Sequence, residues 1–600
     1  MVKVPYIFLC AAPYGRAVPH GQFESAGLLP LLYIMTTHLS ELQKLLSTKQ
    51  YSTAIELLEQ NPEVNALEAE KQACNLSYIY YLMGKYETAK EVIDSALTRA
   101  EADGRAEVWP RLYYRLAKAH EGLQDYDAMC SAYDQMYERL PEDDRDKKLK
   151  HMQDYYNKNV NYMIGWVVHC GGYAEHLQVE YYDVDYRGLT LSSNIKKKEN
   201  VIRVPYKCVF GLRDSKINNP YVRQITKAGL QITAEHTFVA LDLIHEKHTN
   251  GARMPYIRCL PKEYSNIPFN FTLSELTMLA GSYSLIKILQ KLLSYKIEYT
   301  KYQDVYLQTY KEMPPFTFAE FVWGRTAVIT RIYKVNRGGN VDNVMVPVAD
   351  MANHAIPPNT GWKFDDSADS FVVDAETNLS KGAVIYETYG EKCNYRYFVN
   401  YGFTVDNNPY EEATIQTNAV YRHMLNAYAK EVISSYDQRV VIRELFDLHL
   451  FSSLDSRFVG FVMEDKSAYQ IGYTYNDVAK KLFAELRGSA PAPISREDET
   501  KVHEQIVSIV DGTLSGFLTS IEEDETLLAN NEYTFNLRNT IVQRKEEKKV
   551  LEYWKTLSKN FISALTDGSK RSFKKLNKKM NKWAGFASFA PYIAELEKLK

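Results

Sequence analysis

Two short stretches constrain this chain more than any other part of it. The first is VPVADMANH at residues 346–354, and the second is ETYGEKCNYRYFVNYGF at residues 387–403. An Asn-His or Tyr-Gly pair alone arises by chance in most chains of 600 residues. Here both follow a hairpin-like pattern, GLTLSSNIKKKENVIRVP at 188–205, and the first is preceded by a strand-like pattern, NVDNVMVP at 340–347. Four such elements in this order are hard to explain by accident.

These elements resemble the signature motifs of SET-domain protein methyltransferases. The resemblance implies a pseudoknot at the Asn-His stretch, where the chain passes under a neighbouring loop, an arrangement rare among folds. PYIRCLP at 255–261 lies in a helical pattern that splits the strands. It is similar to a segment of the branch that contains Rubisco methyltransferase and actin-histidine methyltransferase. That branch has a helical C-terminal substrate-binding domain, so a helical region is expected after Phe403.

Composition narrows the class of protein. A chain of 600 residues is too long for one hydrophobic core. Its net charge of -3 gives no global positive field, so we expect protein or small-molecule partners and no nucleic acid. The seven widely spaced cysteines fit reduced thiols, not a disulfide framework or zinc cluster. No run approaches the ~20 apolar residues of a transmembrane helix. We predict a cytoplasmic protein, which can also be nuclear, without a bound metal.

Residues 38–150 have a helical pattern that repeats. Tyr51, Tyr86 and Tyr126 each open an amphipathic segment, lie 35 and 40 residues apart, and are each followed closely by an alanine. This resembles tetratricopeptide repeats, whose basic period is ~34 residues. Such repeats can present a concave peptide-binding surface to a protein partner. The alternative is a helical brace that only packs against the rest of the protein.

The predicted fold class is therefore multidomain α+β. It combines a tetratricopeptide-like solenoid, a β-rich SET domain with a helical insert and pseudoknot, and an all-α substrate-binding domain. Residues 4–12 have the length of a short signal segment, but Pro5 interrupts it and a loose extension is expected there. The expected boundaries are 1–37 for that extension, 38–150 for the repeats, 160–405 for the SET domain with its insert at about 215–320, 406–555 for the substrate-binding domain, and 556–600 for a basic helical tail.

The implied chemistry is methyl transfer from S-adenosylmethionine. This is an in-line displacement, so the site must hold both reactants collinear and keep the nucleophile unprotonated. The resemblance makes Tyr389 the catalytic tyrosine at the methyl-transfer channel. It also implies no metal. The residues that it implies for binding the cosubstrate are Asp185, Arg187, Thr330, Arg331, Asp350, Asn353, His354, Tyr389 and Phe403.

Two positions bear on the nucleophile. The histidine-methylating branch carries an asparagine two residues after the motif arginine and a tryptophan just before the motif Asp. This chain has Tyr333 and Ala349 there, which resembles the lysine-methylating members. A lysine that enters an apolar channel near a sulfonium loses solvent and meets positive charge, and both favour the neutral amine. The expected channel residues are Tyr333, Ala349, Trp362 and Tyr401.

The sequence favours a protein-lysine N-methyltransferase that acts on a non-histone protein. A protein-histidine methyltransferase is the alternative within the same class. A third possibility is a non-catalytic scaffold, supported by Tyr186, which replaces the first glycine of the usual cofactor loop. The basic tail around Phe573 fits a membrane surface or an acidic partner, and a merely solvated helix face is the simpler interpretation.

Overall fold

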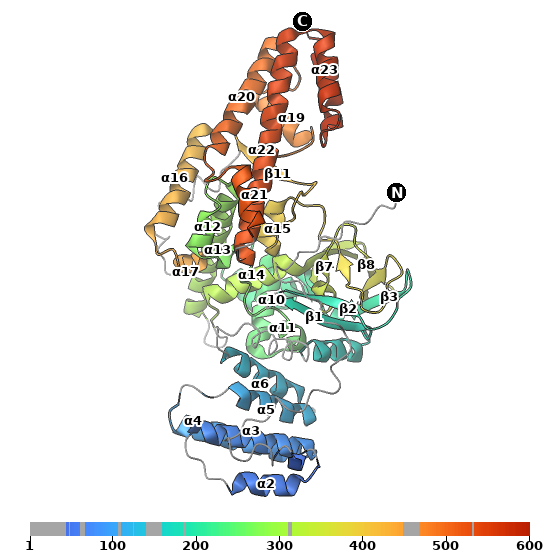
Figure 1. Ribbon diagram of the computed structural model, residues 1–600, viewed down its shortest axis with the longest axis vertical. Coiled ribbons are helices and arrows are strands. Elements are labelled where there is room, and N and C mark those ends of the chain that lie inside the picture. Colours follow the sequence, from blue (N-terminus) through green and yellow to red (C-terminus); the bar gives the residue numbers. More distant parts are fainter. Residues whose placement is uncertain are drawn as a thin grey trace.

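The computed structural model describes residues 42, 44–46, 48–60, 66–105, 108, 110–123, 125–139, 159–183, 186–309, 315–447, 467–530 and 533–599. Along its longest axis, helices of the N-terminal region lie at one end, a strand-rich region lies in the middle, and long helices of the C-terminal region lie at the other end (Figure 1). None of the helices in these ranges is long and apolar enough to cross a membrane.

The N-terminal helices stack in chain order (Figure 1). Tyr51 and Tyr86 each begin a helix, and Ala54 and Ala89 are fully buried. The Ser77 hydroxyl donates to the Ala89 carbonyl at 2.8 Å, so neighbouring helices approach closely where the small residue lies. Tyr162 and Tyr181 of the middle region pack against this helical core, as the brace interpretation requires. The helices are α2 (Tyr51–Glu59), α3 (Ala66–Leu82), α4 (Tyr86–Ala102), α5 (Pro110–Gly122) and α6 (Tyr126–Glu138). Their assignment as tetratricopeptide repeats stays a prediction.

Small sheets form the middle region. The strands are β1 (Leu177–Asp183), β2 (Tyr186–Leu191), β3 (Asn200–Pro205), β4 (Phe210–Gly211), β5 (Ile332–Arg337), β6 (Asn340–Met345), β7 (Asn353–His354), β8 (Thr360–Asp365), β9 (Ser370–Ala375) and β10 (Tyr386–Glu387). β1 pairs with β2, and the two three-stranded sheets have the orders β3-β9-β8 and β4-β6-β5, all antiparallel. Gly338 and Gly339 both have positive φ and join β5 to β6, as a tight hairpin turn requires.

A short parallel pair closes this region. Asn353 pairs with Tyr386, and His354 pairs with Glu387. The two motif stretches therefore lie side by side although more than thirty residues separate them in the chain. Helix α15 (Asn394–Tyr401) lies inside the second stretch and is followed by Gly402, which has a φ of 76° that favours glycine. This parallel pair brings the two motifs to one place.

Helices interrupt the strands between β4 and β5, as predicted. α14 begins with a capping box in which the Thr317 hydroxyl accepts from the Glu320 backbone N–H and the Glu320 carboxylate accepts from the Thr317 N–H. The helices of the insert are α8 (Leu212–Asn218), α9 (Pro220–Lys227), α10 (Glu235–Thr249), α11 (Met254–Ile257), α12 (Leu273–Thr277), α13 (Tyr283–Thr309) and α14 (Phe318–Arg331). Their apolar faces share one continuous core with the strands. The motif arginine, Arg331, is the last residue of α14.

The C-terminal region has its own core around the fully buried Trp554 and Phe561. Its elements are β11 (Glu412–Gln416), α16 (Ala419–Ser435), α17 (Ile442–Asp447), β12 (Ala468–Gly472), α19 (Asp477–Leu486), α20 (Arg496–Leu514), α21 (Ile521–Ala529), α22 (Phe535–Asp567), α23 (Lys570–Met580) and α24 (Ala590–Leu596). β11 pairs with β12 in an antiparallel ladder, so the region is not purely helical.

Two expected boundaries differ from the structure. The division at 555/556 falls inside α22, and Phe573, Met580 and Tyr592 pack into the same core as Trp554. The basic tail is therefore part of the C-terminal domain and not a separate segment. α16 and α17 instead contribute to the core of the middle region, although they follow residue 405. In both cases the neighbour that covers the apolar face of the helix determines the domain to which the helix belongs. Composition alone does not identify that neighbour.

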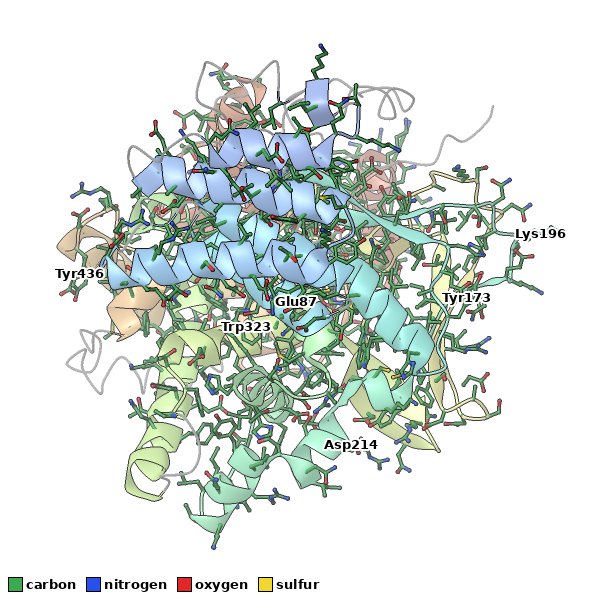
Figure 2. The ribbon with its side chains drawn as sticks, turned by 90° about the horizontal axis from the view of Figure 1, so that it is seen from below. Glu87, Tyr173, Lys196, Asp214, Trp323 and Tyr436 are labelled. Atoms are coloured by element: carbon green, nitrogen blue, oxygen red, sulfur yellow. The ribbon has the colours of Figure 1, made fainter. Side chains whose placement is uncertain are left out.

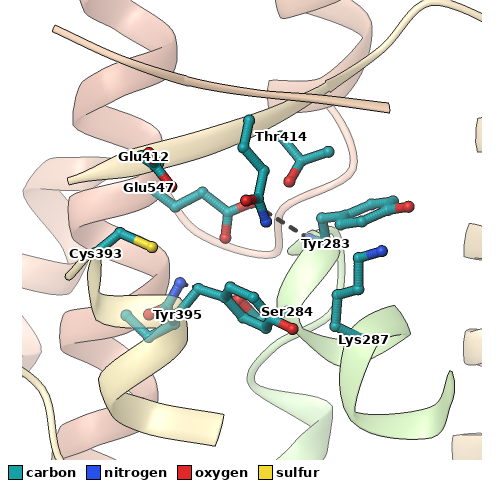
Figure 3. Close-up of a pocket in the computed structure, with 10 residues that line it drawn as sticks. Tyr283, Ser284, Lys287, Cys393, Tyr395, Glu412, Thr414 and Glu547 are labelled. Carbon is teal, nitrogen blue, oxygen red and sulfur yellow. Dashed lines mark hydrogen bonds between the residues drawn. The ribbon is translucent and has the colours of Figure 1, made fainter. Parts of the chain in front are cut away.

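α22 joins the two large regions through buried polar contacts. Near the start of α22, the side-chain oxygen of Asn539, Oδ1, accepts two hydrogen bonds from Thr404. The Thr404 backbone N–H donates at 3.0 Å and the Thr404 hydroxyl at 2.8 Å. About two turns further along the helix, the Glu547 carboxyl accepts from the Ser282 hydroxyl and from the Tyr283 N–H at 3.3 Å. Figure 3 shows Glu547 reaching toward Tyr283 across a small pocket that Cys393 and Thr414 also line. Burial raises the pKa of Glu547 to about 7.

Candidate active site

A strained turn precedes Asp350, the carboxylate residue of the first motif. Val348 has φ 69° and ψ -55°, and the Ala349 N–H donates to the Pro347 carbonyl at 2.8 Å. This is a γ-turn with positive φ at a β-branched residue, a rare and strained conformation. The Val348 side chain is fully buried, so its surroundings hold the turn in place. Backbone strain of this kind concentrates at functional sites, and here it places Asp350 in a short 3-10 helix, Ala349–Met351.

Asp350 and Arg331 form a buried ion pair. Arg331 Nη1 lies 3.4 Å from Asp350 Oδ2 and donates to the Asp350 carbonyl at 2.9 Å. The Tyr256 hydroxyl, from the insert, also donates to Asp350 Oδ2. Burial raises the pKa of Asp350, and Arg331 partly opposes that rise. Burial works against the charge of Arg331, but Asp350 outweighs it, so the pKa of Arg331 is raised and the guanidinium stays charged.

This pair has unused hydrogen-bonding capacity. Asp350 Oδ1 and Arg331 Nε are buried and have no hydrogen-bond partner within the described part of the chain. Such atoms are costly to bury unless a partner is supplied. A zwitterionic ligand fits both: an ammonium group can donate to Asp350 and a carboxylate can accept from Arg331. The residues present therefore fit the amino-acid end of S-adenosylmethionine.

Asn353 binds the backbone of β2. Its Nδ2 donates to the Arg187 carbonyl at 2.9 Å. A Cβ at Gly188 would lie 2.9 Å from that nitrogen, so the close approach depends on glycine. The Arg187 guanidinium donates in turn to the Cys259 carbonyl of the insert. Asn353 thereby ties the first hairpin, the insert and the motif turn together.

Both ring nitrogens of His354 are engaged within the protein. Nδ1 accepts from the Tyr389 N–H at 3.0 Å, which leaves the proton on Nε2. Nε2 lies 3.0 Å from the Tyr397 hydroxyl, which donates to the Gly390 carbonyl at 2.6 Å. Burial lowers the pKa of His354 to about 4, and Lys392 adds to the effect. The imidazole is therefore neutral at pH 7 and holds the second motif against the first.

Aromatic rings surround Tyr389. Its hydroxyl donates to the Ala352 carbonyl at 2.8 Å. The Tyr401 ring stacks on it with centroids 5.0 Å apart, and the His354 ring lies 5.1 Å away. Phe403 is edge-on at 6.2 Å and stacks on Tyr397 at 4.9 Å. Burial raises the pKa of Tyr389, so the phenol stays protonated at neutral pH. A cation beside such a cluster would face several ring surfaces.

The predicted channel residues Tyr333 and Trp362 lie together although their strands, β5 and β8, belong to different sheets. Their ring centroids are 5.3 Å apart in an edge-on arrangement, and Ala349 is buried in the same hydrophobic core. The Tyr333 hydroxyl approaches both oxygens of Glu387, at 2.8 and 2.9 Å. Burial raises the pKa of Glu387 well above its usual range, and the hydrogen bond from Tyr333 partly opposes that rise. The raised pKa disfavours a negative charge on this side of the site.

The structure brings most predicted site residues together, with two exceptions. The Thr330 hydroxyl donates to the Thr326 and Ala327 carbonyls of its own helix, so it does not point to the cluster. Asp185 lies outside the described residues. Sequence reasoning missed Tyr256, Glu387 and Tyr397. Glu387 and Tyr397 stand inside the second motif, but only the folded structure shows that one binds Tyr333 and the other His354.

Comparison with known proteins first identifies part of the C-terminal region. Residues 472–551 match the family model for Rubisco LSMT substrate-binding domains. The actin-histidine N-methyltransferase of Gallus gallus is 24% identical over 411 residues, which cover 65% of this chain and 67% of that protein. The human actin-histidine N-methyltransferase is 23% identical over 407 residues, which cover 65% and 66%.

Solved structures decide the fold. The SET domain of LSMT bound to lysine and AdoHcy superposes with a TM-score of 0.53 at 17% identity, covering 73% of this chain and 98% of that one. Rubisco LSMT bound to AdoMet gives a TM-score of 0.52 at 16% identity, covering 72% and 99%. The chain has the SET-domain fold. The resemblance of its motifs to this family is thus confirmed, and the parallel β7-β10 pair lies where the SET pseudoknot was predicted.

Metal ligation is not indicated at the SET domain or elsewhere in the described ranges. No group of three or more His, Cys, Asp or Glu side chains there is arranged to hold a metal ion. Cys74, Cys170, Cys208, Cys259 and Cys393 are free thiols. Several polar groups of the SET site are instead paired with one another, while Asp350 Oδ1 and Arg331 Nε have no hydrogen-bond partner among the described residues.

Proposed function

We propose that this protein is an S-adenosylmethionine-dependent protein methyltransferase. The observation that carries the proposal is the buried Arg331–Asp350 pair, with its unused hydrogen-bonding atoms, next to Tyr389 and His354. Rubisco LSMT, which has the same fold, has been solved with bound AdoMet, and its SET domain with bound AdoHcy. S-adenosylmethionine supplies an electrophilic methyl group on a sulfonium. The protein holds the amino-acid end of that molecule at Asp350 and Arg331 and faces its cation with aromatic rings.

Tyr389 is the catalytic residue in this proposal. Its hydroxyl is fixed by the Ala352 carbonyl and its ring by Tyr401 and His354. Because the raised pKa keeps the phenol neutral, Tyr389 does not serve as a base at pH 7. It orients the methyl group and the incoming nitrogen. The proton of the nucleophile leaves to solvent before transfer.

We propose lysine as the nucleophile. Tyr333, Ala349 and Trp362 form apolar or aromatic walls, which suit a long aliphatic side chain. The raised pKa of Glu387 supports this, because an ionised carboxylate there would stabilise the unreactive ammonium form. The SET domain of LSMT, which shares this fold, has been solved with bound lysine.

Histidine remains the second candidate because the relatives named above are actin-histidine N-methyltransferases. The Glu387–Tyr333 pair offers oxygen atoms that could align an imidazole by hydrogen bonds. A non-catalytic scaffold is the third candidate, and it would leave the buried Arg331–Asp350 pair without a chemical use.

A protein partner for the helices α2 to α6 is also proposed, on the basis of the predicted repeats alone.

Transfer of labelled methyl groups tests these candidates. The purified protein is incubated with labelled S-adenosylmethionine and a proteome extract, and modified residues are mapped by mass spectrometry. Tyr389→Phe is compared with Tyr553→Phe, a matched control that also removes a tyrosine hydroxyl bound to a backbone carbonyl, at 3.2 Å from the Tyr473 oxygen. Label on lysine that falls at least tenfold in Tyr389→Phe alone supports the proposal. Label on histidine favours the second candidate, and no label with a folded protein favours the scaffold.

A further inference from the structure

Helix α23 carries a double stripe of basic side chains at the far end of the molecule. Its apolar residues are buried: Phe573 is 1% exposed, Leu576 5% and Met580 0%. The exposed cations recur every four residues in adjacent pairs. The pairs are Lys570 and Arg571, Lys574 and Lys575, and Lys578 and Lys579, and the exposed Lys582 follows just after the helix. Figure 1 places α23 beside the end of α22 that is remote from the strands.

The burial of the apolar face decides which kind of partner fits. An amphipathic helix binds a membrane by inserting its apolar face among the lipid chains. Here Phe573, Leu576 and Met580 belong to the core of the C-terminal domain, so that face is already used. What remains outside is polar and, apart from Asn577, positively charged. A partner must therefore be recognised by its negative charge and not by apolar insertion.

Spacing points to an extended acidic peptide segment. Residues four apart on a helix are about 6 Å apart along its axis, and alternate side chains of an extended chain are about 6.6 Å apart. One carboxylate can therefore lie opposite each turn of α23 over the whole stripe, which is about 18 Å long. The chain as a whole carries a net charge of -3, so this basic surface is local and does not create the global field that favours long polyanions.

Two neighbours of the basic stripe, Asp567 and Asn560, show how its positive charge is placed. Asp567, at the end of α22, is an acid close to it, and its pKa is lowered first by hydrogen bonds from Ser569 and then by Lys575 and Arg571. Lys579 donates to the Asn560 side chain at 2.7 Å, which keeps its positive charge at the surface. A salt bridge at an exposed site contributes little alone, but several in one row add up.

We propose that the basic face of α23, residues 570–582, binds an acidic extended segment of the substrate protein. The assignment to a substrate rests on the proposed methyltransferase function and on the neighbouring match to a substrate-binding family model at 472–551. About 21 residues of α22 separate the Thr404–Asn539 contact from Asn560, which corresponds to about 30 Å. The acidic segment would therefore lie well away from the modified residue, in a folded protein or a long unstructured region.

Direct binding tests the surface without any need for catalysis. Fluorescence anisotropy with the full chain measures the affinity for a labelled twelve-residue oligoglutamate in low and in physiological salt. Lys574→Gln/Lys575→Gln/Lys578→Gln is compared with Lys196→Gln/Lys197→Gln/Lys198→Gln. The control triplet also consists of exposed lysines and lies at the outer edge of the molecule, where Figure 2 labels Lys196. We expect the first variant to weaken binding about tenfold and the control to leave it unchanged.

Other outcomes would overturn the proposal. Equal affinity of both variants and wild type, or no binding by wild type, would show that α23 does not recognise acidic peptides. Tighter binding to poly(U) RNA or to vesicles rich in phosphatidylserine, lost in the α23 variant, would assign the surface to another partner. Should the first variant fail to fold, Lys570→Gln/Arg571→Gln/Lys582→Gln gives the same comparison. Because no methyl transfer is measured, a failure here is distinct from a failure of the proposed function.

Discussion

The backbone N–H of Tyr389 donates to Nδ1 of His354 at 3.0 Å, so the imidazole of a residue predicted to bind the cosubstrate fixes the second motif. The partner on the other side of the ring is the Tyr397 hydroxyl, 3.0 Å from Nε2. Through these bonds the two motif stretches hold each other in position. Any contribution of His354 to ligand binding would come from its backbone.

His354→Ala is expected to lower the free energy of unfolding by about 3 kcal/mol, because it leaves the Tyr389 N–H without an acceptor and opens a cavity. His354→Asn keeps an acceptor near the Nδ1 position and should lose less. Urea unfolding and methyl transfer are measured on both. A variant with wild-type stability but weakened S-adenosylmethionine binding would contradict the structural role and place the imidazole on the ligand.

Substitutions at Glu387 and at its partner Tyr333 test whether the Glu387 carboxyl is protonated. We expect Tyr333→Phe to cost about 2 kcal/mol, because the buried carboxyl loses its hydroxyl partner. Glu387→Gln should cost less than about 1 kcal/mol, since the amide oxygen still accepts from Tyr333. Thermal denaturation at pH 7 gives both values. If Glu387→Gln is the more damaging change, the group is an ionised carboxylate in the folded protein and our argument for a lysine nucleophile loses its electrostatic support.

His503 makes the C-terminal domain sensitive to acid. Its ring stacks on Phe561 at 4.7 Å and contacts Ser558 and Tyr592, and burial lowers its pKa to about 3. Below pH ~6.5 the unfolded chain binds the proton more readily than the folded one, so stability is lost as the pH falls. We expect the stability advantage of wild type over His503→Gln to shrink by about 1.4 kcal/mol per pH unit between pH 6 and 4. A constant difference in urea unfolding would contradict this.

Glu547, at the contact between α22 and the middle region, should have the opposite effect: its contribution to stability is lost as the pH rises. Its pKa is raised to about 7, so the folded protein binds a proton that the unfolded chain releases near pH 4.5. Stability from this group is complete below pH ~4.5 and is lost as the pH rises through about 7. Between pH 5 and 8, Glu547→Gln should gain roughly 3 kcal/mol relative to wild type in urea unfolding. Glu547 is one of the charges that raise the pKa of Glu411 to about 8, so part of the measured difference above pH 7 comes from Glu411.

Motif order predicted the SET fold and several of the side chains that lie together where the two motifs meet. Asn353, Tyr389, Tyr401 and Phe403 come together as expected because their spacing matches a family pattern. The roles of Glu387 and Tyr397 could not be read from the sequence, because their partners, Tyr333 and His354, lie 54 and 43 residues away in the chain.

The C-terminal segment shows a second limit of sequence reasoning. Its composition suggested a separate basic tail, whereas Phe573 and Tyr592 complete the core around Trp554. Charge is visible in a sequence and marks the exposed face of α23. The neighbour that covers the opposite face depends on how α22 and α20 are placed, which local pattern does not specify.

The parallel pairing of β7 with β10 also governs when the site can form during synthesis. His354 is synthesised before Tyr389, Tyr397 and Phe403, so the first motif has no partners while the intervening strands are made. Contacts across such separations form late, after loop closure has been achieved. A nascent chain can therefore complete its N-terminal helices and much of its insert well before it has any site for a substrate.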